Sequence, residues 1–133
     1  MQNQLFINGE FVDAVGGNRL AVINPHDGSV ITEIAEGRQA DIDLAVSAAK
    51  AAFPQWRAMP AAERGRLLLK LADALESNLE EFAQLESLNT GHPIKDSRFL
   101  DVPRTAACFR YFGGMADKIQ GDVMPVETGF LNY

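Results

Sequence analysis

The sequence has few of the features that would place it outside ordinary soluble proteins. Its single cysteine cannot form a disulfide within the chain. No uncharged apolar run approaches the roughly 20 residues that cross a bilayer, and the polar N-terminus without Lys or Arg lacks the pattern of a secretory signal. Lys and Arg number 12 against 18 Asp and Glu, giving a net charge of −6, which argues against nucleic-acid binding. We therefore expect a cytoplasmic protein with neither a membrane nor a nucleic-acid partner.

The common catalytic and cofactor-binding motifs are also missing. There is no G-x-G-x-x-G, no P-loop, no C-x-x-C and no H-E-x-x-H. His26 and His92 stand beside prolines in turn-like stretches, which is typical of surface turns. Cys108 lies among small apolar residues without a neighbouring His or Lys, which favours a buried structural thiol over a nucleophile. The residues alone thus indicate no catalytic and no cofactor-binding position.

The 133 residues are enough for one domain, and the first third indicates two β-hairpins. Two short apolar runs, 5–7 and 11–12, flank Asn8-Gly9, a pair that suits a tight hairpin turn. A second pair of runs, 20–23 and 30–34, is joined through a turn that contains Pro25 and Gly28.

Three helices are expected to follow. Apolar residues recur at helical spacing from Ile42 to Phe53, and Pro54 should end or bend this helix. A longer helix begins near Pro60 and runs to about residue 89. A third covers about 96–119, with Pro103 in an early turn or at a break. Four glutamates are expected on the solvent face of the long helix: Glu76, Glu80, Glu81 and Glu86.

The end of the sequence again resembles β structure, at 123–126 and 130–133. Strand-like sequence up to the last residue suggests a chain cut from something longer. The helical stripes also need a cover larger than two hairpins: Leu68, Leu71, Leu75, Leu79, Phe109 and Phe112. We therefore expect the isolated chain to aggregate or pack loosely.

Several segments in order resemble the N-terminal part of the NAD(P)-dependent aldehyde dehydrogenase family. They are Leu5–Phe11, the Asn-Pro-x-x-Gly turn at 24–28, the first helix at 40–53 followed by Trp56, Glu63-Arg64 with the leucine-rich helix, the stretch 85–94 ending in Asn-Thr-Gly-His-Pro-Ile, and the Arg-Tyr-Phe-Gly-Gly stretch at 110–118. The resemblance implies an α/β fold, incomplete here, with two hairpins and three helices. Residues 1–119 would be the outer N-terminal part of the cofactor-binding domain. Residues 120–133 would begin the β extension through which family members form dimers or tetramers.

The family oxidises aldehydes to carboxylic acids with NAD or NADP, through a thiohemiacetal on a cysteine. The resemblance places the catalytic residues beyond residue 133, so it implies no catalytic or cofactor-binding residue here, and Cys108 does not match the nucleophile. This chain alone would be inactive. The alternative is a free-standing α/β interaction module, or an inactive remnant, that binds a partner through its leucine-rich helices.

The resemblance also implies two minor sites. Some family members hold a monovalent cation at positions that match Val22, Ile23 and Asn89, where Asn89 replaces an acid and removes a formal charge. The helix with Asp101 and Arg104 resembles the one that borders the substrate entrance. Arg104 would there favour a polar or anionic aldehyde, although a solvated surface arginine is the simpler interpretation.

Overall fold

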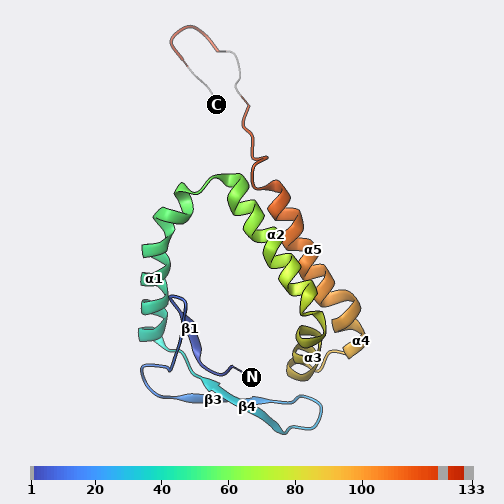
Figure 1. Ribbon diagram of the computed structural model, residues 1–133. Coiled ribbons are helices and arrows are strands. Elements are labelled where there is room, and N and C mark those ends of the chain that lie inside the picture. The colour runs from blue at the N-terminus through green and yellow to red at the C-terminus, as the bar shows by residue number, and fades with distance from the viewer. Residues whose placement is uncertain (1, 123–125, 131–133) are drawn as a thin grey trace.

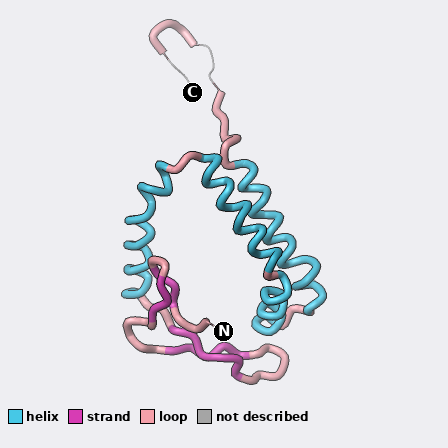
Figure 2. Tube along the Cα trace, in the orientation of Figure 1, coloured by secondary structure: helices cyan, strands magenta, loops and turns pink. Residues whose placement is uncertain are grey.

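The computed structural model describes residues 2–122 and 126–130. Its elements in chain order are β1 (Leu5–Ile7), β2 (Glu10–Val12), β3 (Arg19–Ile23), β4 (Val30–Ala35), α1 (Gln39–Ala58), α2 (Ala61–Ser77), α3 (Leu79–Thr90), α4 (Ile94–Asp96), the π-helical turn η1 (Ser97–Asp101) and α5 (Val102–Met115). In Figure 1, α1 forms one side of an open frame and α2 and α5 together form the other. The strands lie at the base, as Figure 2 shows in magenta.

Both predicted hairpins are confirmed. β1 pairs with β2 and β3 pairs with β4, each antiparallel, and the two pairs form separate two-stranded sheets. Asn8 and Gly9 both have positive φ angles, 54° and 84°, which is the geometry that a tight two-residue hairpin turn requires. The second ladder is irregular between Val22 and Ile23. Within residues 2–122 and 126–130 neither hairpin has a third strand, so each depends on the helices for cover.

Helix α1 begins at a buried carboxylate. Asp41 accepts hydrogen bonds from the backbone N–H of Arg38, at 2.9 Å, and of Val15, at 2.8 Å. These bonds, first that from Arg38, hold the pKa of Asp41 below its ordinary value. Pro54 was expected to end or bend this helix, and it does not end it, because α1 continues to Ala58. A proline inside a helix removes one hydrogen bond, and its ring clashes with the carbonyl four residues earlier. The last turn of α1 nevertheless continues beyond Pro54.

The expected long helix is two helices. α2 ends at Ser77, and Asn78 leaves helical geometry with φ −113° and ψ 24°. Its side-chain amide donates to the carbonyl of Ala74 at 2.8 Å, so the asparagine satisfies a carbonyl that the interrupted helix leaves free. α3 then starts at Leu79 in a new direction.

The third helical segment starts earlier and ends earlier than expected, running from Ile94 to Met115. It contains the π-helical turn η1 just before Pro103, which occupies the first turn of α5. Because a proline has no N–H to donate, a helix tolerates it best in a first turn or beside a local widening. Ser97 in η1 is fully buried, and its hydroxyl has no hydrogen-bond partner among the described residues.

α2 and α5 pack against each other over most of their lengths. The contact is made by small residues, with Gly65 and Ala72 buried on α2 and Ala106 and Gly113 buried on α5. Part of the apolar stripe expected to lack cover is therefore covered by this helix pair. Small side chains let two helix backbones approach closely, which fixes α5 on α2.

Much apolar surface is nevertheless exposed. The chain exposes 10102 Å², whereas a compact monomer of 14.5 kDa exposes about 6,900 Å². Leu71, Phe53 and Phe112 each expose 42% or more of their surface. The expectation that these helices need a larger cover agrees with this excess.

The C-terminal strand prediction lies mostly outside the described residues, at 123–125 and 131–133. Residues 126–130 form a turn, in which the N–H of Phe130 donates to the carbonyl of Glu127 at 3.3 Å. Val126 and Phe130 were expected in strands, and neither is in one. The backbone donor is used within this local turn, so it does not join a ladder.

Candidate functional site

The predicted entrance residues lie where α3, η1 and α5 meet. Asp101 ends η1, and its side chain lines a cavity of about 210 Å³, with Leu75, Phe82, Glu86, Val102 and Thr105. Arg104 lies one helical turn later on α5 and is exposed; it is not among the residues that line this cavity. The structure therefore places the two residues on neighbouring turns but in different surroundings.

The side chain that contacts Asp101 is His92. Its Nδ1 lies 2.7 Å from Oδ2 of Asp101. A carboxylate only accepts hydrogen bonds, so Nδ1 must carry the proton. This pair joins the loop after α3 to the π-helical turn. The sequence predicts an ordinary turn residue at His92 and gives no sign of this contact, because the two partners are nine positions apart in different elements.

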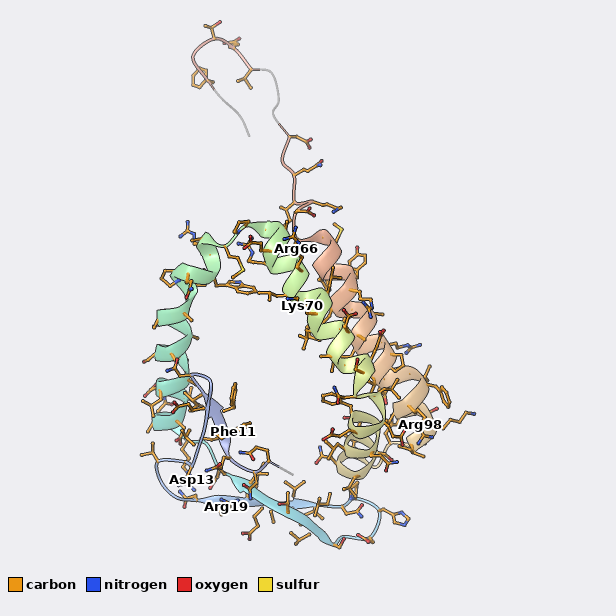
Figure 3. All side chains as sticks on the ribbon, in the orientation of Figure 1. Phe11, Asp13, Arg19, Arg66, Lys70 and Arg98 are labelled. Atoms are coloured by element: carbon orange, nitrogen blue, oxygen red, sulfur yellow. The ribbon has the colours of Figure 1, made fainter. Side chains whose placement is uncertain are left out.

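An ion pair also connects α3 with η1 in this region, and its arginine, Arg98, is labelled in Figure 3. The guanidinium of Arg98 donates to both carboxylate oxygens of Glu80, at 2.8 and 2.6 Å. Mainly through this bond, and with help from Gln84, the pKa of Glu80 is lowered to about 2. Glu80 is exposed as expected, yet it is bound across two helices and is not simply solvated.

The Arg98–Glu80 pair predicts a specific acid sensitivity. A carboxylate whose pKa is lowered on folding stabilises the folded state above its unfolded pKa, and this contribution is lost as the pH falls through the folded value. Glu80→Gln should therefore flatten the loss of stability between about pH 4.5 and pH 2. Thermal unfolding midpoints at several pH values would measure it. Glu81→Gln is the matched control, since Glu81 forms no ion pair with a described residue, and an equal change in both variants would contradict the prediction.

Arg110 on α5 makes a similar bridge to α2. It contacts Asp73 at 2.8 Å and also Glu76. The contact with Glu76 raises the pKa of Arg110 most, and the contact with Asp73 raises it further. Of the four glutamates expected on a solvated face, Glu76 and Glu80 thus connect helices.

Two of the three predicted cation ligands line the same cavity. Val22 and Asn89 line one cavity of about 360 Å³ between the second hairpin and α3, but Ile23 does not. The lining is mainly hydrocarbon, and its polar side chains are Thr32, Glu86 and Asn89. Hard cations prefer several oxygen ligands, and this lining offers only a few. The cation site stays a prediction.

The expectation that Cys108 is buried is wrong, because its side chain is exposed. α5 turns its small residues Ala106 and Gly113 toward α2, and Cys108, two positions after Ala106, falls on a different face of the helix. No hydrogen bond or ion pair joins the thiol to another described residue. The described residues thus hold no activated nucleophile.

Cofactor and membrane features are likewise missing from the described part of the chain. No group of three or more His, Cys, Asp or Glu could hold a metal there. No described helix is both long and apolar enough to span a membrane.

Comparisons with known proteins agree with one another. The model of the aldehyde dehydrogenase family matches residues 11–133. The mitochondrial aldehyde dehydrogenases of Leishmania tarentolae and Homo sapiens are 47% and 43% identical to this chain, each over 98% of it and 26% of the relative.

Solved structures extend the likeness to the fold. PnpE from Pseudomonas sp. WBC-3 is 72% identical with a TM-score of 0.94, over 98% of this chain and 27% of its own. A Bacillus cereus aldehyde dehydrogenase, the G224D mutant, is 40% identical with a TM-score of 0.93, over the same shares. The chain therefore spans about a quarter of the length of its relatives. On this evidence the chain belongs to the aldehyde dehydrogenase family and corresponds to its N-terminal segment.

Proposed function

We propose that the protein oxidises an aldehyde to a carboxylic acid with NAD or NADP, through a thiohemiacetal on a cysteine beyond residue 133. The observation that carries the proposal is the family match over residues 11–133. A structure of PnpE, 72% identical over this chain, was solved in complex with nicotinamide adenine dinucleotide, which supports NAD. We place the catalytic cysteine elsewhere because Cys108, which is a free and exposed cysteine, does not match the family's nucleophile.

The residues described here would form a supporting layer in such an enzyme. Residues 1–119 would be the outer part of the cofactor-binding domain, and residues 120–133 would begin an extension that pairs subunits into a dimer or tetramer. The large exposed apolar surface of α1, α2 and α5 supports this role, because such faces need a cover. No step of the redox chemistry is assigned to these residues.

An aldehyde panel tests the proposed activity. The whole protein should reduce NAD or NADP, read at 340 nm, with at least one aldehyde, whereas the 133-residue chain alone should show neither turnover nor NAD binding by calorimetry. Comparing both cofactors would establish the preference. Turnover by the chain alone, or no turnover by the whole protein with any aldehyde, would contradict the proposal and favour an interaction module.

Arg104 gives the proposed substrate a chemical class. It is exposed on α5 and forms no ion pair with a described residue, so its guanidinium is available to a carboxylate. If α5 borders the entrance, as the family resemblance implies, an aldehyde bearing a second, anionic group would be favoured. Asp101 lies on the preceding turn of the same border.

Replacing Arg104 tests this preference. Arg104→Met should raise KM about tenfold for a carboxylate-bearing aldehyde, because one charge-assisted hydrogen bond at an exposed site is lost. KM for a neutral aldehyde of similar length should stay the same. Steady-state kinetics measure both, and Arg66→Met on α2 is a control, since Arg66 is also exposed and unpaired among the described residues. Equal changes for both aldehydes would contradict an anionic preference.

Two further proposals concern the setting of the enzyme. A cytoplasmic location is proposed from the sequence alone, and several relatives are named as mitochondrial enzymes. A monovalent cation bound by Val22, Ile23 and Asn89 is proposed from the family resemblance, and the shared cavity of Val22 and Asn89 supports it.

A further inference from the structure

We propose that His92 is a positioning residue that keeps Asp101 away from Arg104, so that the arginine remains free for an anionic substrate. This inference rests on the proposed function of Arg104. The charged side chains at this corner are paired so that His92 contacts Asp101 and Arg98 contacts Glu80.

Asp101 has an arginine three residues away on either side, Arg98 and Arg104. Residues three apart on a helix are neighbours, and opposite charges at that spacing can form a stabilising ion pair. Yet Asp101 forms an ion pair with neither of them. Arg98 is bound through two hydrogen bonds to Glu80, and Asp101 is bound to His92 at 2.7 Å. Arg104 is the one member of this group that has no partner among the described residues.

His92 is held in place by its own backbone. The hydroxyl of Ser87 donates to the carbonyl of His92 at 2.7 Å, and the N–H of His92 donates to Oγ1 of Thr90 at 3.2 Å. Both contacts come from the last turn of α3. The ring is therefore presented to Asp101 by a fixed loop, and the carboxylate is directed toward α3.

Loss of the histidine should redirect Asp101. Asp101 lines the same cavity as Glu86, and two carboxylates in one cavity repel each other. One helical turn further along α5, Arg104 is a cation without a partner among the described residues. An Asp101–Arg104 pair would then compete with the substrate's carboxylate for the guanidinium.

Kinetics of the whole enzyme test this competition. His92→Ala should raise KM about two- to threefold for a carboxylate-bearing aldehyde, the factor expected from a competing helical ion pair. KM and kcat for a matched neutral aldehyde should not change. His92→Asn, whose amide can still donate to Asp101, should behave like the parent. The double variant His92→Ala, Asp101→Asn should restore the parent KM, because it removes the competing charge.

Each contrary result has one meaning. If His92→Ala affects both aldehydes equally, or if the double variant is not restored, His92 acts only on folding and the inference is overturned. If Arg104→Met raises KM for the anionic aldehyde but His92→Ala does not, the inference fails while the proposed role of Arg104 stands. If Arg104→Met itself has no effect, the proposed anionic preference fails, and the inference fails with it.

Discussion

Gly65→Ala should destabilise the protein by about 1–2 kcal/mol. A Cβ at Gly65 would lie 2.5 Å from the carbonyl oxygen of Gly113 and 3.3 Å from the Cβ of Ala116. The first neighbour is backbone, so α2 and α5 would have to move apart, and overpacking of this kind costs about 1–3 kcal/mol, occasionally more. Alanine's better helix propensity returns only about 1 kcal/mol. Urea unfolding followed by circular dichroism would measure the change.

The adjacent glycines of α5 provide a matched control. A Cβ at Gly113 would lie 3.0 Å from the carbonyl oxygen of Gly65, whereas a Cβ at Gly114 would meet nothing within 4 Å. Gly113→Ala should therefore destabilise the protein, and Gly114→Ala should stabilise it by up to about 1 kcal/mol. If all three alanine variants are equally stable, the close contact of α2 with α5 does not exist.

The sequence predicted the local parts of the fold well. Asn8-Gly9 determines a hairpin through backbone angles that few other residues adopt, and this short-range rule needs no knowledge of the surroundings. The turn with Pro25 and Gly28 was predictable for the same reason. The existence of three helical regions followed from apolar periodicity alone.

The helix boundaries depended on information that periodicity does not contain. The apolar stripe continues through Leu75 and Leu79 as if no break were present, and the break comes from one asparagine whose amide binds a carbonyl four residues back. Pro54 led to the opposite error, because an end of the helix was expected at this proline and α1 continues past it.

The site was predicted less well, because its contacts join different elements. The small residues around Cys108 predict a buried thiol. Whether a residue of α5 is buried, however, depends on whether it lies on the face that meets α2. His92 lies in the loop after α3 and Asp101 is the last residue of the π-helical turn η1, so their contact joins two elements. The pairing of Arg98 with Glu80, 18 residues away, could not be inferred from spacing either.

Gly91→Ala should destabilise the protein by about 2 kcal/mol. Gly91 ends α3 with a φ of +75°, and a residue with a Cβ pays about 1 kcal/mol to adopt this left-handed conformation. Its Cβ would also lie 2.9 Å from Cγ of Pro25, in the turn of the second hairpin. The substitution should therefore strain the helix end and push the hairpin away from α3. Urea unfolding measures the total cost.

Gly28→Ala separates these two effects. Gly28 has nearly the same φ, +74°, but a Cβ there would meet nothing within 4 Å. Gly28→Ala should therefore lower the stability only by the conformational strain, about 1 kcal/mol. The difference in stability between the two variants then measures the contact with Pro25. Pro25→Ala should recover part of the cost of Gly91→Ala and none of the cost of Gly28→Ala. Equal costs for the two glycines would mean that the turn of the second hairpin does not press on the end of α3.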